Sequence, residues 1–148
     1  MTRSSVLAAT QDQLPLLQSM LAAHLAELGG PPDYPYLPRY WQEPGRFVFV
    51  IGDGAAEGFA LVRRVPETGA HELAEFYVRP ESRRRGLGAR AMSELLSLFP
   101  GPWQLRVGRA NVGGLRFWKA VLPRPLVELP GSDAGQLLLG FGSHPISG

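Results

Sequence analysis

The segment VRPESRRRGLG, residues 78–88, joins three consecutive arginines to two glycines. Its charged and flexible positions are Arg83, Arg84, Arg85, Gly86 and Gly88. Glycines allow a sharp backbone turn and leave main-chain N–H groups open to an approaching anion, which the arginines would also attract. The segment therefore predicts a phosphate-binding loop, with a tight turn beside a solvated basic run as the alternative. It lacks the lysine of a P-loop and the third glycine of a dinucleotide fingerprint.

The residues on either side of this segment indicate that a strand precedes it and a helix follows it. Residues 73–78 are mostly apolar and β-prone, and Pro80 ends regular pairing because it has no N–H group. Leu87, Ala91 and Leu95 then recur at four-residue steps, as on one face of an amphipathic helix. The free N–H groups and the positive dipole end of that helix would face a bound phosphate.

Glu75 is the candidate acid–base residue of the preceding strand. The two-residue period of a strand groups Glu75 with Leu73 and Tyr77, so its carboxylate would lie on an otherwise apolar face. Such a carboxylate suits a general base that takes a proton from an ammonium group. The alternative is a structural ion pair with one of the many arginines. Glu72 and His71 are weaker candidates for the same role.

A second motif lies downstream, in NVGGLRFWKAVL at residues 111–122. An asparagine opens this predicted helix, and the aromatic pair Phe117 and Trp118 lies near its end. The two motifs resemble those of the GNAT superfamily of N-acetyltransferases. In that family the pattern Q/R-x-x-G-x-G/A forms the acetyl-CoA pyrophosphate loop after a strand ending in Val-x-Pro, here Val78 and Pro80. The resemblance covers roughly residues 5–141.

The resemblance implies a fold and an activity. The fold is α/β (α+β), with a mixed, mostly antiparallel seven-stranded sheet flanked by helices in a single domain spanning residues 1–148. The activity is direct transfer of an acetyl group from acetyl-CoA to a primary amine of a small molecule, peptide or protein. A non-catalytic acyl-CoA-binding or sensory module on the same fold is the alternative. Homodimer formation is compatible with the resemblance.

The resemblance also implies the cofactor contacts. Main-chain groups of Phe76 and Val78 would bind the pantetheine arm, and an N–H of Phe76 or Tyr77 would polarise the thioester oxygen. Asn111 would bond the pantetheine amides as well as cap its helix, although capping alone explains an asparagine there. The implied cofactor-binding residues are Phe76, Tyr77, Val78, Arg83, Arg84, Arg85, Gly86, Leu87, Gly88, Ala89, Asn111, Gly114, Phe117 and Trp118.

Trp118 departs from the family pattern. Many relatives place a tyrosine at this point to protonate the departing thiolate, and an indole N–H is not an acid at accessible pH. Three explanations stay open: Tyr77 substitutes as the acid, the thiolate leaves unprotonated because its pKa is about 8.5, or catalysis is weak or absent. The resemblance supports Glu75 as the base, so Glu75 and Tyr77 are the predicted catalytic residues.

Residues 29–45 form a segment rich in proline and aromatic residues, which is predicted to lack regular structure. Rigid aromatic side chains on exposed loops often line a binding cleft. In the resembling family this region commonly shapes the acceptor pocket. Tyr34, Tyr36 and Trp41 are therefore predicted to contact the amine acceptor, and the alternative is that these rings cover the edge of the core.

Hydrophobic periodicity predicts the remaining elements. Thr10 and Asp12 are the candidate N-caps of the first helix, and Asp12 is preferred because it places Pro15 in the first turn. His24 would lie on the surface of that helix. Predicted strands span residues 5–8, 46–51, 58–63, 71–78, 103–107, 126–129 and 136–141. Predicted helices span residues 12–28, 87–99 and 111–121.

The composition of the 148-residue chain narrows the function classes, and its 45% hydrophobic content suits one domain with one core. The chain has no cysteine, which excludes disulfides, thiolate metal ligands and a cysteine nucleophile, and no His, Asp and Glu spacing predicts another metal site. The lack of a signal-like start or a long apolar run predicts a cytoplasmic location without a membrane partner. A net charge of +2 argues against a nucleic-acid partner, and RNA binding is a third, weaker hypothesis.

Overall fold

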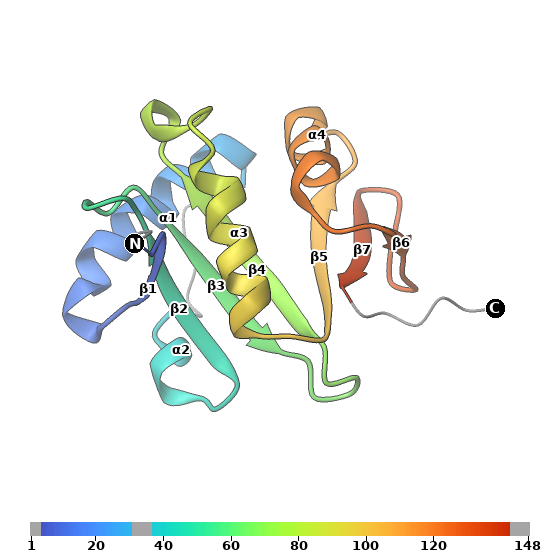
Figure 1. Cartoon of the computed structure of the whole chain (residues 1–148), viewed down its shortest axis with the longest axis horizontal. Helices are drawn as coiled ribbons and strands as arrows, with labels where there is room; N and C mark the ends of the chain where they lie inside the picture. Colours follow the sequence, from blue (N-terminus) through green and yellow to red (C-terminus); the bar gives the residue numbers. More distant parts are fainter. Residues whose placement is uncertain (1–3, 31–36, 143–148) are drawn as a thin grey trace.

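A mixed sheet forms the centre of the computed structural model, which describes residues 4–30 and 37–142 (Figure 1). Within these residues the sheet has seven strands in the order β1-β2-β3-β4-β5-β7-β6. The strands are β1 Val6–Ala8, β2 Arg46–Ile51, β3 Gly58–Arg64, β4 His71–Val78, β5 Pro102–Gly108, β6 Val127–Glu128 and β7 Gln136–Gly142. Neighbouring strands are antiparallel except β4 and β5, which are parallel. The predicted mixed, mostly antiparallel sheet is confirmed.

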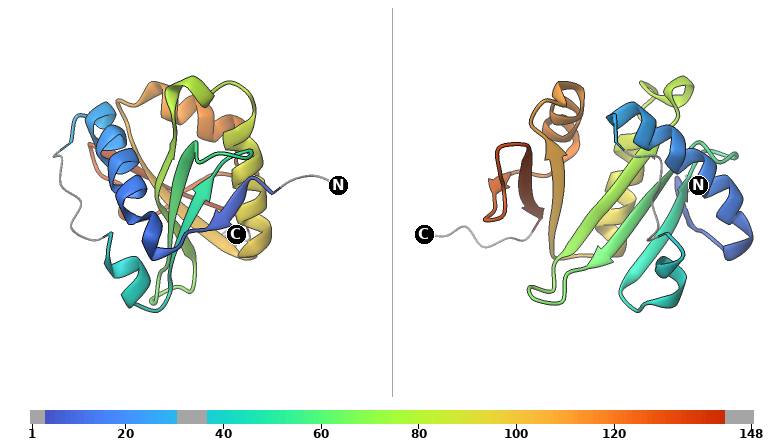
Figure 2. Two further views of the ribbon diagram at one scale, coloured as in Figure 1. Left: turned by 90° about the vertical axis from the view of Figure 1, so that its left-hand side faces the viewer. Right: turned by 180° about the vertical axis from the view of Figure 1, so that it is seen from behind.

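Helices cover both faces of the sheet, as the left panel of Figure 2 shows. They are α1 Leu14–Leu28, α2 Arg39–Gln42, α3 Leu87–Leu98 and α4 Val112–Val121, with short 3₁₀ turns η1 Gln11–Gln13 and η2 Pro80–Ser82. α1 and α2 pack on one face through Leu17, Leu21 and Tyr40. α3 packs on the other face through Met92 and Leu95, and α4 lies on the same side. We call these two sides of the sheet the α1 face and the α3 face.

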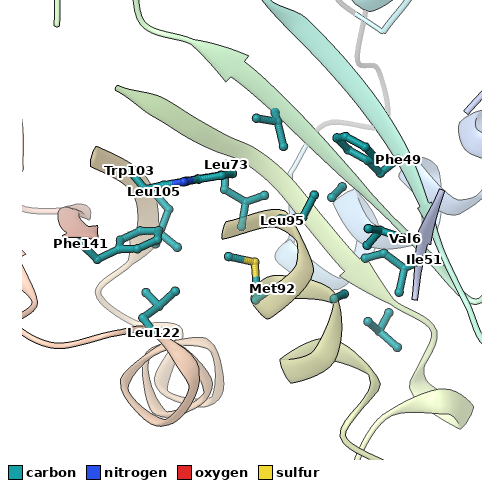
Figure 3. Close-up of a cluster of buried hydrophobic side chains, with 14 of the residues drawn as sticks. Val6, Phe49, Ile51, Leu73, Met92, Leu95, Trp103, Leu105, Leu122 and Phe141 are labelled. Atoms are coloured by element: carbon teal, nitrogen blue, oxygen red, sulfur yellow. The ribbon is translucent and has the colours of Figure 1, made fainter. Parts of the chain in front are cut away.

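The larger hydrophobic core lies between the sheet and α3 (Figure 3). Met92 and Leu95 of α3 pack there with Ile51, Trp103 and Phe141, and all five side chains are fully buried. These residues come from both halves of the sheet, so the core fixes β4 and β5 relative to α3. The strand, loop and helix that carry the predicted phosphate motif are therefore parts of one packed unit.

The first helical segment begins differently from the prediction. A 3₁₀ turn precedes α1, and the Oε1 atom of Gln13 accepts a hydrogen bond from the Thr10 N–H at 2.9 Å. Thr10 caps this segment, so the preference for Asp12 is wrong and the other candidate, Thr10, is the cap. Pro15 does lie in the first turn of α1, where its missing N–H costs no hydrogen bond. Gly29 ends the helix with a φ of 72°.

A short helix, α2, lies inside the segment that was predicted to lack regular structure. Pro38 occupies the N-cap position of α2, so the proline precedes the helix and interrupts none of its hydrogen bonds. The side chain of Tyr40 is buried in the core on the α1 face, which stabilises the turn. The prediction of irregular structure is therefore wrong for residues 39–42.

His71 begins β4 and packs in an aromatic cluster on the α3 face. Its ring centroid lies 4.7 Å from that of Phe99 and 5.6 Å from that of Trp103. Burial, together with the nearby positive charge of Arg64, lowers the pKa of His71 below its usual value. His71 thus contributes to the core, on the opposite face of the sheet from Glu75.

The lowered pKa of His71 should make the folded state less stable on acidification. As the pH drops below about 6.5, the unfolded chain binds a proton at this histidine before the folded chain does, so protonation favours unfolding. We expect the urea midpoint of the wild type to fall more between about pH 7.5 and about pH 5.5 than that of His71→Gln. Parallel pH profiles for the two proteins would contradict this role.

Candidate active site

A β-bulge in β4 sets the directions of the candidate catalytic side chains. Leu61 of β3 pairs with Glu75, but the next residue, Val62, pairs with Leu73, so β4 carries Ala74 as an extra residue. A bulge of this kind turns two consecutive side chains to the same face, here those of Ala74 and Glu75. Ala74 packs on the α1 face and Leu73 on the α3 face. The prediction that Leu73 shares the face of Glu75 is therefore wrong.

The Glu75 side chain meets His24 of α1. The Glu75 Oε2 atom lies 3.6 Å from the His24 Nε2 atom, and both side chains are mostly buried. The His24 ring also packs against the rings of Phe59 and Tyr77, with centroids 5.9 Å and 5.6 Å away. The predicted surface position of His24 is therefore wrong. The sequence does contain a signal for this position, because the apolar residue Met20 lies one helical turn before His24 on the same face of α1. Met20 is buried in the structure.

Glu72, the weaker base candidate, is buried and held by two partners. Its Oε2 atom accepts a hydrogen bond from the Arg63 Nε at 2.6 Å, and its Oε1 atom accepts one from the Gln104 Nε2 at 2.7 Å. Because the partners come from β3 and β5, the carboxylate joins three neighbouring strands. A buried carboxylate bound in this way is a structural group, and Glu75 is the more accessible of the two.

β4 and β5 pair over a short distance and then diverge (Figure 1). In the part of the chain that the structure describes, their pairing ends at Leu73 and Leu105. Arg79 directly follows β4, and its N–H donates to the carbonyl of Glu57, the residue before β3, at 2.8 Å. Successive main-chain N–H groups along a strand point to alternate sides. The N–H groups of Phe76 and Val78 therefore face away from β3, toward the side where β5 has diverged. This edge of β4 can accept an extended ligand segment.

The loop after β4 leaves the start of α3 accessible. Arg84 and Gly86 both have positive φ angles, of 66° and 76°, and Gly86 is the N-cap residue of α3. A Cβ atom built on Gly86 would have no heavy atom within 4 Å. The first N–H groups of a helix lack partners within the helix, so those of α3 are available to an anion here. This geometry agrees with the predicted phosphate loop.

Arg83 fastens the loop to α1 and β4. Its Nη2 atom lies 2.7 Å from the Glu27 Oε1, and its Nε donates to the Val78 carbonyl at 2.7 Å. Its guanidinium group also lies over the Tyr77 ring, 5.7 Å from the centroid. These contacts give Arg83 a structural role in shaping the loop.

The other two arginines differ from Arg83 and from each other. Arg85 lies 3.1 Å from the Glu57 carboxylate, which also accepts a hydrogen bond from Ser82. The Ser82 hydroxyl, with smaller contributions that include Arg85, lowers the pKa of Glu57. Arg84 is exposed and has no ion-pair partner among the described residues. The three arginines that were predicted to attract an anion therefore differ in their contacts, because Arg83 and Arg85 bind separate carboxylates.

Gly88 allows α3 to pack closely against the aromatic pair of α4. A Cβ atom at this position would lie 3.0 Å from the Phe117 ring and 3.7 Å from the Phe76 ring. Phe117 and Trp118 contact each other with ring centroids 4.8 Å apart, and Trp118 lies 5.3 Å from Phe76. The aromatic pair therefore packs on β4 at its diverging edge. Leu87 is buried in the same core, so only its main chain can face a ligand.

Asn111 caps α4 as predicted. Its Oδ1 atom accepts a hydrogen bond from the Gly114 N–H at 2.9 Å. A Cβ atom on Gly114 would lie 2.5 Å from the Asn111 Nδ2, so a glycine fits beside this cap. The short distance between these two residues explains the glycine without a ligand.

Tyr77 and Trp118 lie on opposite faces of the sheet. Tyr77 is buried on the α1 face with α1, whereas Trp118 packs on the α3 face. Burial, with Glu27 as the next cause, raises the pKa of Tyr77, so its phenol stays protonated. Tyr77 is therefore a weak acid in a different place from the family tyrosine that Trp118 replaces.

A pocket of about 380 Å³ opens on the α1 face, next to the bulge in β4. The charged side chains that line it are Arg39, Arg46, Arg63, Glu72, Glu75 and Arg106. Tyr40 of α2 and the backbone at Ala74 also border it. Because Glu75 is shared between this pocket and the diverging edge of β4, the pocket can hold an acceptor group close to that edge.

Of the three aromatic residues that were predicted to contact the amine acceptor, the structure describes only Trp41. Trp41 is half-buried beside the core on the α1 face, and its indole N–H donates to the Ala9 carbonyl at 3.4 Å. It does not line the pocket, so its contacts agree with the alternative that it covers the core edge. Tyr34 and Tyr36 lie outside the described residues.

Neither a metal cluster nor a membrane-spanning helix is present in the described part of the chain. Across residues 4–30 and 37–142, no group of three or more His, Asp or Glu side chains is placed to hold a metal ion. Over the same ranges, no helix combines the length and apolar character needed to cross a bilayer.

The model of the acetyltransferase (GNAT) family matches residues 16–121, which is most of the chain. The chain belongs to this family. The matched range includes the predicted phosphate loop and the helix with the aromatic pair. None of the curated proteins matches this GNAT acetyltransferase.

Solved structures with the same fold are distant in sequence. An acetyltransferase from Thermus thermophilus is 19% identical, with a TM-score of 0.72 and coverage of 92% of this chain and 93% of that one. A PaiA N-acetyltransferase from Thermoplasma acidophilum in complex with coenzyme A is 12% identical, with a TM-score of 0.67 and coverage of 95% and 99%. A spermidine N-acetyltransferase from Vibrio cholerae in complex with CoA and spermine is 11% identical, with a TM-score of 0.74 and coverage of 93% and 94%. At these identities the likeness establishes the GNAT fold.

Proposed function

We propose that this acyltransferase moves an acetyl group from acetyl-CoA directly to a primary amine of a small molecule, peptide or protein. The observation that carries the proposal is the arrangement along β4. One end of the strand leads to the accessible start of α3, and Glu75 lies at the bulge beside a pocket. Among the residues that the structure describes, the edge of β4 toward β5 is unpaired beyond Leu73. A candidate phosphate site, a candidate site for an extended chain and a carboxylate thus follow one another along a single strand.

Acetyl-CoA would supply the acetyl group as a thioester. The main-chain N–H groups at the start of α3 would bind its pyrophosphate, with Arg84 adding positive charge. The Val78 N–H and the Phe76 carbonyl, which both face away from β3, would bind the pantetheine arm beside β4. The two solved relatives that contain coenzyme A support this choice of cofactor.

Glu75 is the proposed general base. An amine attacks a carbonyl carbon only through an uncharged nitrogen, so the ammonium proton would pass to the Glu75 carboxylate, directly or through a water molecule. His24 would hold that carboxylate in place. As the N–C bond forms and the C–S bond breaks, the electron pair leaves on sulfur, and the second proton that the nitrogen loses passes to solvent. The Phe76 N–H would stabilise the charge on the carbonyl oxygen.

The sulfur would leave as a thiolate. Tyr77 lies across the sheet from Trp118 and has a raised pKa, so it is the less favoured acid. A thiolate with a pKa of about 8.5 is an adequate leaving group. The missing tyrosine also favours a second candidate function, a non-catalytic acyl-CoA sensor on the same fold.

Two measurements test the proposal. Calorimetric titration of acetyl-CoA into the protein measures cofactor binding, and release of free thiol with a panel of primary amines measures transfer. We expect binding together with amine-dependent thiol release. Binding without release for every amine would favour the sensor, and a protein that does not bind acetyl-CoA would contradict both functions.

A further inference from the structure

The pocket beside Glu75 is rich in arginine. Its lining includes the guanidinium groups of Arg39, Arg46, Arg63 and Arg106 and the carboxylates of Glu72 and Glu75. These arginines come from α2, β2, β3 and β5, so they surround the pocket from several elements. The lining side chains therefore carry more positive than negative charge.

The strand register explains how the arginines come together. Arg46 of β2 pairs directly with Arg63 of β3, which pairs with Glu72 of β4, which pairs with Gln104 of β5. Arg106 lies two residues beyond Gln104 and therefore on the same face. Like charges directly opposite on neighbouring strands are destabilising. Two adjacent arginines in one row indicate a site that favours an added negative charge.

Existing contacts neutralise only part of this charge. Arg63 is balanced by Glu72 at 2.6 Å, and Arg46 lies 2.8 Å from the exposed Glu43. Arg106 donates to the Gly131 carbonyl at 3.1 Å, and a carbonyl has no formal charge. Each guanidinium group has five N–H donors, so these contacts leave further donors on Arg106 and Arg46.

Asp133 is the acidic residue close to Arg106 in the turn before β7. Hydrogen bonds from the Gln136 and Gly135 N–H groups lower the pKa of Asp133, with smaller contributions from Arg106 and Arg109. Its Oδ1 atom accepts hydrogen bonds from the Gly135 and Gln136 N–H groups, so its main role is to shape that turn. Asp133 is also absent from the pocket lining.

We propose that the acceptor is a small amine that also carries an anionic group, a carboxylate or a phosphate. The proposal rests on the proposed acetyl transfer. The amine would lie at Glu75 and the anion at Arg46 and Arg106, whose planar guanidinium groups match the geometry of either anion. A volume of about 380 Å³ suits a small acceptor. A polyamine such as the ligand of the Vibrio cholerae relative would meet an excess of positive charge here.

The test uses acceptors that differ only in side-chain charge. Glycyl-glutamate amide, glycyl-glutamine amide and glycyl-arginine amide share one α-amine and carry charges of opposite sign or none. We expect kcat/KM for the glutamate peptide to exceed that for the glutamine peptide by about tenfold or more, with the arginine peptide lowest. The ratio of kcat/KM for glycyl-phosphoserine amide over glycyl-serine amide, set against the glutamate-to-glutamine ratio, tells whether phosphate is preferred to carboxylate. Equal rates or a preference for the arginine peptide would overturn the proposal.

Substitutions locate the preference in the pocket. Arg106→Gln changes an exposed side chain, so it should fold normally and reduce the preference for the glutamate peptide to about threefold or less. Arg46→Gln provides a second, independent variant. Arg64→Gln is the matched control, because it removes one positive charge from the opposite face of β3 and should keep the full preference. Loss of the preference in Arg64→Gln, or its survival in both pocket variants, would overturn the assignment.

Binding measurements separate this proposal from the proposed function. If no peptide is acetylated, the transferase function fails on its own. The N-acetylated forms of the same peptides can then be titrated into the protein with CoA present. Tighter binding of the glutamate form by about tenfold supports an anion-selective pocket, and equal affinities contradict it.

Discussion

Glu75→Gln should lower kcat/KM for amine acetylation by about 10²- to 10³-fold, as expected for removal of a general base. The substitution keeps the size of the side chain and replaces only the group that can accept a proton. The dissociation constant of acetyl-CoA should stay the same, because the proposed cofactor contacts on β4 are made by main-chain groups. Thiol-release kinetics and calorimetry measure the two quantities separately.

Glu67→Gln is the matched control for this experiment, since it removes a carboxylate from the exposed turn between β3 and β4. It should leave kcat/KM unchanged. A Glu75→Gln protein that retains wild-type kcat/KM would show that the acceptor loses its proton by another route. A loss of acetyl-CoA affinity in Glu75→Gln would instead indicate that Glu75 supports the cofactor site.

Gly86→Val should weaken acetyl-CoA binding by about a hundredfold or more. A β-branched residue strongly disfavours the positive φ of 76° at this position, so the loop would have to rearrange. The new side chain would also project into space that is now open at the start of α3. Calorimetric titration of acetyl-CoA into the variant measures the change.

Gly69→Val separates the loss of a site from the cost of backbone strain. Gly69 has the same φ of 76°, and a Cβ atom added there would also meet open space, but it lies in the turn before β4, at the opposite end of that strand from the loop. Both variants should lose similar stability, of about 1–2 kcal/mol. Only Gly86→Val should lose affinity. Equal affinity losses in the two variants would argue against a phosphate site at α3.

The sequence predicted the features that depend on local patterns. The strand and helix beside the predicted phosphate loop, the cap at Asn111 and the succession of strands and helices along the chain follow from periodicity, from proline and glycine positions and from short-range hydrogen bonding. The family resemblance rests on the same local segments. Each of these features involves residues that are close together along the chain.

The incorrect predictions depend on contacts between distant residues. The face of Leu73 depends on the register between β3 and β4, because the bulge appears only when the two strands are paired. His24 is buried through contacts with Phe59 and Tyr77 on two strands. Arg83, which was predicted to attract a phosphate, instead pairs with Glu27 of α1, a residue far away in the sequence. Strand periodicity and residue type carry no information about these partners.

The opening between β4 and β5 ends where the two strands begin to pair, at Leu73 and Leu105. The opening therefore has a defined length along β4. From Val78 to Ala74 the strand extends about 13 Å at roughly 3.3 Å per residue. A chain that entered beside β4 from the α3 end would therefore end near the bulge, with the paired strands directly ahead. An acyl group much longer than acetyl would have to separate Leu73 from Leu105 or turn toward the pocket. In the proposed transfer, the same pairing that closes the sheet would thus limit the length of the acyl group.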